Sequence, residues 1–157
     1  MTQLRAGLVG IGMIGRNHAR LLNSLDGVTL VAVADPAGDK HGTAGAAKVV
    51  PTVAEMIDHG LDFAVVATPT IYHLEAGLQL AAAGVPTLIE KPLATDVEES
   101  RQLVDAFEGA GLVNAVGHIE RFNPALRALR ARLEAGEIGD LYQVATRRQG
   151  PPDGAEA

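Results

Sequence analysis

Short runs of apolar residues alternate with longer amphipathic segments along most of the chain. The runs at 28–35 (VTLVAVAD) and 61–68 (LDFAVVAT) are almost continuously apolar. This pattern is typical of strands buried on both faces, because a strand with one solvated face alternates apolar and polar residues. Such strands, separated by helices, predict an α/β fold built on a doubly wound parallel sheet, the Rossmann architecture.

The pattern predicts a strand or a helix for most segments up to residue 117. Strands are expected at 6–10, 28–35, 48–50, 61–68, 86–90 and 112–117. Helices are expected at 13–25, 52–58, 71–84 and 95–111. Thr52 should cap the second helix, and Thr95 should cap the fourth in a capping box with Glu98. Residues 42–48 contain two glycines, so they form a weak helix at best.

The chain changes character after this point. Residues 123–139 predict a basic helix, and 140–150 predict a half-exposed strand that mixes polar and apolar residues. We therefore expect a dinucleotide-binding domain over 1–120. Residues 121–150 would be a crossover helix and the first strand of an α+β domain that this chain does not complete. The remaining residues, 151–157, should be a disordered tail.

Composition excludes several functional classes. The formal net charge of −6 and the pI near 5.3 disfavour a nucleic-acid partner, which would require a basic face. The chain has no cysteine, so thiolate catalysis and cysteine-based metal sites are excluded. No histidine–carboxylate set has metal-ligand spacing, and we expect no metal. We see neither a signal peptide nor a long apolar run, which predicts a cytoplasmic protein that does not bind membranes.

Three glycines between the first strand and the first helix fit the pattern G-x-G-x-x-G. Gly10 permits a tight turn, Gly12 lets the backbone approach a pyrophosphate, and Gly15 lets the helix pack against the strand. The N–H groups of Met13 and Ile14 would face the phosphates at the positive end of the helix dipole.

Asp35 ends the second strand, 20 residues after Gly15. This is the spacing expected of a carboxylate that binds the adenosine ribose of a dinucleotide. A free carboxylate repels a 2′-phosphate, so NAD is favoured over NADP as the cofactor. Alternatively, Asp35 serves only the turn at 35–39 (DPAGD), since Asp-Pro favours turns.

Two polar stretches follow later strands, at the edge where doubly wound sheets bind ligands. In 67–73 (ATPTIYH), Thr68 and Thr70 offer hydroxyl groups, and Pro69 holds the loop off the helix. In 90–93 (EKPL), Lys91 is a candidate catalytic residue. A single lysine is otherwise most often a solvated surface charge.

The segments GIGMIG (10–15), VADP (33–36), ATPTIYH (67–73) and EKPLA (90–94) resemble the succession of motifs in the Gfo/Idh/MocA family of oxidoreductases. GHIERFNPA (117–125) resembles a narrower branch that includes UDP-N-acetylglucosamine 3-dehydrogenases. The resemblance implies hydride transfer between NAD(P) and the hydroxyl-bearing carbon of a sugar, cyclitol or nucleotide sugar. It also implies a homo-oligomer.

The resemblance implies a role for several side chains. Lys91 would lie near the reacting hydroxyl, where a base must accept a proton while the hydride leaves. Thr68, Thr70, His73 and Glu90 would contact the nicotinamide side of the cofactor. His73 could instead only cap its helix. Family members have a second domain that completes the site, so the alternative is a dinucleotide-binding module without catalysis.

A polar cluster follows the sixth expected strand. His118, Arg121 and Asn123 either form a rim that meets the substrate or belong to a polar crossover between domains. Arg121 could pair with the diphosphate of a nucleotide sugar. His18 and His59 are expected to be structural, and His41 to be solvated.

Overall fold

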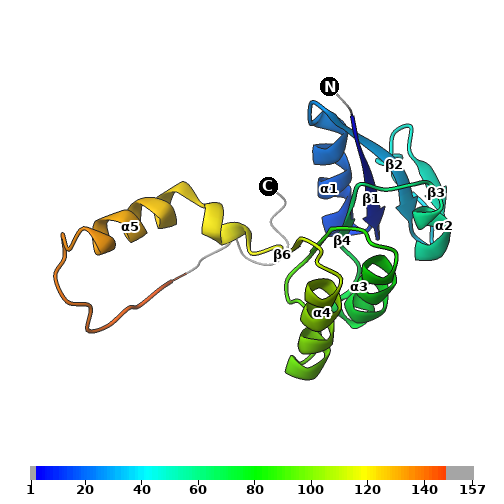
Figure 1. The fold of residues 1–157 in the computed structure, drawn as a ribbon. Coiled ribbons are helices and arrows are strands. Elements are labelled where there is room, and N and C mark those ends of the chain that lie inside the picture. Colours follow the sequence, from blue (N-terminus) through cyan, green and yellow to red (C-terminus); the bar gives the residue numbers. More distant parts are fainter. Residues whose placement is uncertain (1–2, 148–157) are drawn as a thin grey trace. The chain divides into compact units, whose positions relative to one another are not determined.

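The computed structural model describes residues 3–147. Six parallel strands form one sheet in the order β3-β2-β1-β4-β5-β6 (Figure 1). The strands are β1 (Leu4–Val9), β2 (Val28–Ala34), β3 (Lys48–Val50), β4 (Phe63–Val66), β5 (Thr87–Ile89) and β6 (Asn114–Val116). This is the strand order of a dinucleotide-binding Rossmann sheet, and it confirms the predicted fold class.

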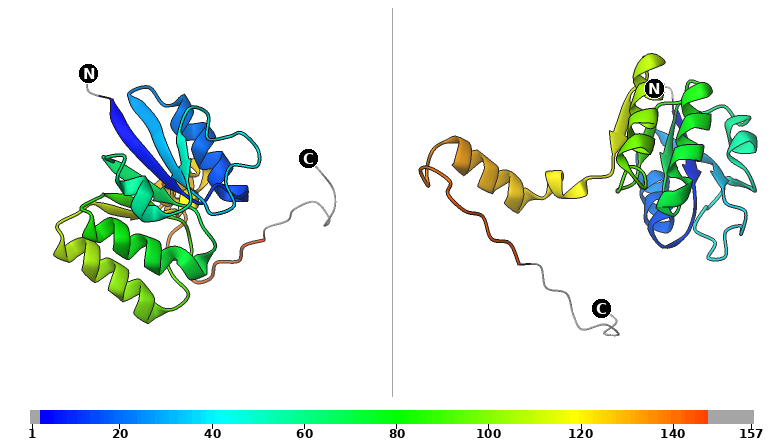
Figure 2. Two further views of the ribbon diagram at one scale, coloured as in Figure 1. Left: turned by 90° about the vertical axis from the view of Figure 1, so that its right-hand side faces the viewer. Right: turned by 90° about the horizontal axis from the view of Figure 1, so that it is seen from below.

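Helices cover both faces of the sheet (Figure 2) and connect all successive strands except β2 and β3, which a loop joins. They are α1 (Met13–Ser24), α2 (Val53–Ile57), α3 (His73–Ala82) and α4 (Val97–Gly109), and the chain continues to α5 (Pro124–Glu134). Two short 3₁₀ turns, η1 (Thr70–Tyr72) and η2 (Ile119–Phe122), precede α3 and α5. No helix within residues 3–147 is both long and apolar enough to cross a bilayer.

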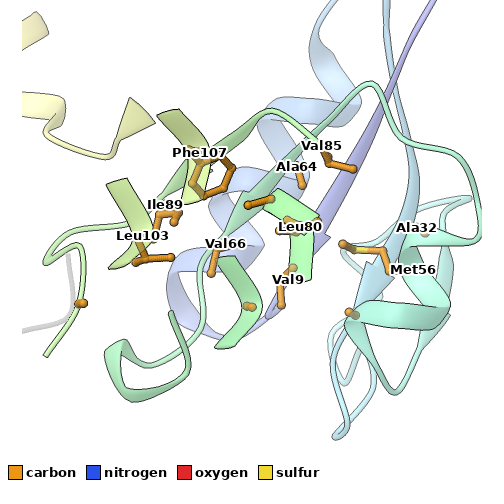
Figure 3. Packing of buried hydrophobic residues seen from close by; sticks show 14 of the residues in the cluster. Val9, Ala32, Met56, Ala64, Val66, Leu80, Val85, Ile89, Leu103 and Phe107 are labelled. Atoms are coloured by element: carbon orange, nitrogen blue, oxygen red, sulfur yellow. The ribbon is translucent and has the colours of Figure 1, made fainter. Parts of the chain in front are cut away.

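Two apolar clusters hold the helices to the sheet. On one face, Leu103 and Phe107 of α4 pack with Leu80 of α3, Met56 of α2 and Ile89 of β5 (Figure 3). On the other face, α1 packs onto β1 and β2 through Ala19 and Leu22, which are buried with Leu8, Leu30 and Val33. Burial on both faces explains why the strands read as continuous apolar runs.

Three local predictions are wrong. The N-cap of α4 is Asp96 and not Thr95, because the Asp96 carboxylate accepts the N–H of Glu99 over 2.8 Å. Residues 42–48 form turns followed by the first residue of β3, and no helix. Residues 141–147 form no strand in the described part of the chain. The last part of that expected strand, and the expected tail at 151–157, lie outside the described residues.

The chain divides after His118 into two compact units. The first contains the whole sheet with α1 to α4, and the second contains η2 and α5. All leucines of α5 are at least partly exposed, and no residue of this helix is buried. The first unit therefore contains the core described above and the pocket described below.

Candidate functional site

A pocket of about 710 Å³ opens at the carboxyl ends of β1, β2 and β4. The strand order reverses between β1 and β4, and ligands of open α/β sheets bind at such a reversal point. Five residues that the sequence singled out line the pocket: Gly10, Gly12, Asp35, Thr68 and Pro69. The fold therefore brings the glycine loop, the acid after β2 and the loop after β4 to one cavity.

The glycine loop crosses the ends of two strands in close contact. Gly10 has a φ of +83°, and its N–H donates to the carbonyl of Ala34 over 2.8 Å. A Cβ at Gly10 would lie 2.9 Å from Cγ2 of Thr68 and 3.0 Å from the carbonyl oxygen of Ala67. Both the positive φ and the close approach require glycine here.

The other two glycines differ in their surroundings. A Cβ at Gly12 would have no atom within 4 Å, so this side of the loop faces open space at the start of α1. A Cβ at Gly15 would overlap the carbonyl oxygen of Gly10 and lie 2.8 Å from its carbon. Gly12 therefore leaves room for a ligand, whereas Gly15 is required by the packing of the helix against the loop.

The start of α1 presents backbone donors to this open space. Gly12 is the N-cap, no side chain caps the helix, and no acidic residue lies in its first turn. The N–H groups of Met13 and Ile14 therefore have no partner within the helix. An anion would be stabilised there by these donors and by the helix dipole.

Asp35 is half-buried beside the pocket and fastens two backbone segments. Its Oδ2 accepts the N–H of Ile11 over 2.9 Å, and its Oδ1 accepts the N–H of Ala37 over 2.8 Å. The second bond belongs to the Asp-Pro turn, and the first joins that turn to the glycine loop. Each oxygen has further acceptor capacity, so the carboxylate can order the turn and bind a ligand hydroxyl together.

Thr68 lines the pocket, and its hydroxyl is buried without a hydrogen-bond partner. Among the described residues, its Oγ1 is the one buried side-chain polar atom without a hydrogen-bond partner. Pro69 is exposed, and Thr70 is partly exposed and begins η1. A buried hydroxyl without a partner costs free energy unless a ligand or water satisfies it.

His73 does not face the pocket. Its side chain is buried, with the residue only 1% exposed, and Nε2 lies 2.9 Å from the carbonyl oxygen of Thr68. Nδ1 lies 3.0 Å from the carbonyl oxygen of Pro92 and 3.2 Å from that of Leu93. The ring therefore joins the loop after β4 to the loop after β5, and this geometry favours a structural role over direct contact with a cofactor.

Glu90 directly follows β5, and its carboxylate contacts His18 and the backbone of Lys91. Oε1 lies 2.9 Å from Nε2 of His18 on α1, and Oε2 accepts the N–H of Lys91 over 3.0 Å. A Cβ at Gly117 would lie 2.9 Å from Oε2, so glycine makes room for the carboxylate. Lys91 itself is exposed, and its peptide bond to Pro92 is cis. Neither Glu90 nor Lys91 lines the pocket described above.

The remaining candidates follow β6. His118 is exposed, and so is Arg121 within η2 of the second unit. Asn123 is the N-cap of α5: its Oδ1 accepts the N–H of Ala125 over 3.0 Å, and its Nδ2 donates to Glu120 over 3.0 Å. The structure thus gives Asn123 a capping role, and the substrate contacts expected of these residues stay predictions.

Two sets of contacts were missed by the sequence reasoning. Tyr72 at the end of η1 lines the pocket together with Glu75, Ala76 and Gln79 from one face of α3. Their helical spacing was a usable signal once the helix was placed above the strand ends. The partnership of His18 with Glu90 had no signal, because 72 residues separate them. No group of three potential metal ligands comes together anywhere in residues 3–147.

One carboxylate in the loop after β2 has a perturbed pKa. Desolvation by burial acts to raise the pKa of Asp39, but the N–H groups of Ala44 and His41 and the hydroxyl of Thr43 outweigh it. The net effect is a pKa below the ordinary value of 3.8. Asp39 thus organises residues 39–44 through its ionised form.

Three features lie together where the strand order of this parallel sheet reverses: a glycine loop, a helix N-terminus without an acidic residue or side-chain cap, and an aspartate. Together they define a dinucleotide-binding domain. Comparison with known families agrees: residues 4–118 match the model of the oxidoreductase family with an NAD-binding Rossmann fold, Gfo/Idh/MocA. The chain belongs to this family.

Named relatives act on polyols and sugars. The chain is 34% identical to scyllo-inositol 2-dehydrogenase (NAD(+)) of Bacillus subtilis, over 96% of this chain and 46% of that protein. It is 32% identical to UDP-N-acetylglucosamine 3-dehydrogenase of Acidithiobacillus ferrooxidans, over 94% of this chain and 46% of that protein. The second relative is consistent with the branch expected from residues 117–125.

A solved structure is similar over the same part of the chain. The WlbA dehydrogenase from Bordetella pertussis, in complex with NADH and UDP-GlcNAcA, has a TM-score of 0.81 and 32% identity. The alignment covers 89% of this chain and 42% of that one. The chain thus spans a little under half the length of the proteins it matches.

Proposed function

We propose that this chain is the cofactor-binding part of an NAD-dependent dehydrogenase. The observation that carries the proposal is the hydrogen bond between Ile11 and Asp35, which joins the glycine loop to the carboxylate after β2 at one pocket. The pyrophosphate would bind at Gly12 and the first turn of α1, and the adenosine ribose at Asp35.

Features of the protein itself fit this cofactor. The space beside Gly12 is open to a phosphate, and the buried hydroxyl of Thr68 lacks a partner that a ligand could supply. The negative charge of Asp35 suits the two hydroxyl groups of an NAD ribose and repels the 2′-phosphate of NADP. NAD is therefore the proposed cofactor.

The proposed reaction is hydride transfer from a carbon bearing a hydroxyl group, which becomes a carbonyl carbon, or the reverse transfer to that carbonyl carbon. NAD supplies the hydride acceptor or donor when bound. Lys91 is exposed at the carboxyl end of β5, where its amine can take the hydroxyl proton. The carboxylate of Glu90 accepts the backbone N–H of Lys91, and this bond restrains the backbone of the lysine at the start of its loop.

The proposed substrate is a sugar, a cyclitol or a nucleotide sugar. The support is that the relatives named above are an inositol dehydrogenase and a nucleotide-sugar dehydrogenase. Arg121 is the residue that we propose for a nucleotide-sugar diphosphate.

Titration calorimetry with NADH, NADPH and ADP-ribose tests the cofactor assignment. We expect NADH to bind, NADPH to bind more weakly, and ADP-ribose to compete with NADH for the same pocket. Absence of NADH binding at millimolar concentrations would remove the proposed function.

A second experiment tests the reaction. Candidate inositols, sugars and nucleotide sugars are screened for NADH formation, and Lys91→Met is then measured on the substrate found. Turnover should be abolished, while NADH affinity changes by less than about threefold. Lys40→Met, at an exposed lysine in another loop, is the matched control and should turn over normally.

A further inference from the structure

His73 connects two loops that the proposed reaction uses for different purposes. The loop after β4 carries Thr68, which lines the dinucleotide pocket, and the loop after β5 carries Lys91. The imidazole lies between the main chains of these loops, with three carbonyl oxygens within 3.2 Å of its nitrogens. Nothing in the proposed function so far gives this buried ring a task.

The position of the ring makes it a rigid spacer. His73 is the first residue of α3, and the residue is 1% exposed. Its two nitrogens point to opposite loops: Nε2 toward Thr68, and Nδ1 toward Pro92 and Leu93. A neutral imidazole donates from one nitrogen and a protonated one from both. In either form the flat ring fixes the separation of the two main chains, because no bond within it rotates.

The carbonyl groups that contact His73 belong to, or lie next to, residues with a proposed function. The Thr68 carbonyl belongs to a residue that lines the pocket, and Pro92 follows Lys91 immediately. A shift of either carbonyl moves the attached residue by a similar amount. Displacements of about 1 Å at a reacting group can cost a factor of about 100 in rate.

We infer that His73 is a positioning residue, which sets the Lys91 loop against the wall of the dinucleotide pocket. This inference rests on the proposed function for the meaning of the two loops. In this inference His73 does not make the contact with the nicotinamide that the family resemblance implied. Instead it acts through its hydrogen bonds to the main chain at Thr68 and Pro92.

Three substitutions separate the parts of this role. His73→Phe keeps a flat ring and removes both nitrogens. His73→Gln places an amide donor near the former Nε2, toward Thr68, and His73→Asn places one near the former Nδ1, toward Pro92. Thr87→Val is the matched control, because Thr87 is also a buried polar residue of this unit, and its hydroxyl donates to the carbonyl of Val85 over 2.8 Å.

Amide hydrogen exchange in the cofactor-free protein is the first measurement. The amides followed are those of Tyr72 and Lys91, which donate to the carbonyl of Pro69 and to Oε2 of Glu90 and so report the loops after β4 and β5. At matched global stability, His73→Phe should speed exchange at both by about tenfold or more relative to Thr87→Val. His73→Gln should restore protection mainly at Tyr72, and His73→Asn mainly at Lys91. Unchanged exchange at both amides in His73→Phe would overturn the inference.

The second measurement reports the position of Lys91. Lysine side chains are labelled with ¹³C-methyl groups, and the Lys91 resonance is followed on addition of NAD. We expect a shift in the wild type and in Thr87→Val, and a strongly reduced shift in His73→Phe at saturating NAD. An undiminished shift in His73→Phe would contradict the inference. If NAD fails to bind the wild type, the proposed function fails, while the exchange experiment still decides whether His73 joins the loops.

Discussion

The backbone N–H of Ile11 donates to Oδ2 of Asp35 across 2.9 Å, between residues that are 24 apart in the chain. This bond fixes the glycine loop against the carboxyl end of β2. The other oxygen of Asp35 holds the turn at Ala37. The turn and the ligand-binding roles of this acid are therefore compatible, since one carboxylate builds the corner and borders the pocket.

Replacement of Asp35 should change cofactor preference. In Asp35→Ser, the charged acceptor for the ribose hydroxyls and for Ile11 is lost, and we expect NADH affinity to fall by about tenfold or more. The affinity for NADPH should stay equal or rise, because repulsion of the 2′-phosphate is removed. Calorimetric titration of both cofactors measures the ratio. An unchanged ratio would mean that Asp35 serves only the turn.

Alanine substitutions at Gly12 and Gly15 should separate an effect on cofactor binding from an effect on folding. Gly12→Ala adds a methyl group in open space, so the free energy of unfolding should change by less than about 1 kcal/mol. The same methyl group obstructs the approach of a phosphate, and NADH affinity should fall by about tenfold or more.

Gly15→Ala is the matched variant for the opposite outcome. Its Cβ would overlap the Gly10 carbonyl, so we expect a loss of at least about 2 kcal/mol in unfolding free energy, or failure to fold. Chemical denaturation and NADH titration of both variants make the comparison. Equal destabilisation by the two alanines would contradict the geometry of the loop.

The core on the α4 face should depend strongly on one aromatic side chain. Phe107 is fully buried beside Leu103 and Ile89, so Phe107→Ala should cost about 3–5 kcal/mol of stability. Phe122→Ala is the matched control, because Phe122 is 75% exposed in the second unit and should cost less than about 0.5 kcal/mol. Urea denaturation monitored by circular dichroism gives both values.

Acid should weaken the loop after β2 through Asp39. Its pKa in the folded protein lies below the ordinary 3.8, so the folded state binds this proton more weakly than the unfolded state does. The stabilisation is therefore complete above the ordinary value and is lost as the pH falls through the folded pKa.

Comparing the stability of Asp39→Asn with that of the wild type measures the contribution of the Asp39 charge. Near neutral pH we expect the variant to be less stable by about 1 kcal/mol, a modest value because the carboxylate is partly exposed. The difference should shrink as the pH falls below about 3.8. Asp105→Asn, at an exposed carboxylate on α4, is the matched control for the removal of one surface charge. A constant difference for Asp39→Asn would rule out this role of the charge.

The N-terminus of α4 shows that a local sequence pattern does not always identify the capping residue. Thr95 and Asp96 are both good N-cap residues, and the sequence offered a glutamate three residues after each. In the folded chain, Asp96 caps α4, while the Glu99 carboxylate accepts the N–H and the hydroxyl of Thr95. The two possible caps differ by one residue, and the local pattern did not distinguish between them.

The sequence by itself determined the order of strands and helices, the glycine loop and the position of Asp35. These depend on local spacing, since burial on both faces makes each strand an apolar run and a tight phosphate-binding turn requires glycine. Only the tertiary structure decided that His73 joins two loops, that His18 meets Glu90, and that one face of α3 lines the pocket. Such contacts unite residues from separate strand–helix units. They arise because a parallel sheet gathers the carboxyl ends of its strands at one edge, whatever their distance along the chain.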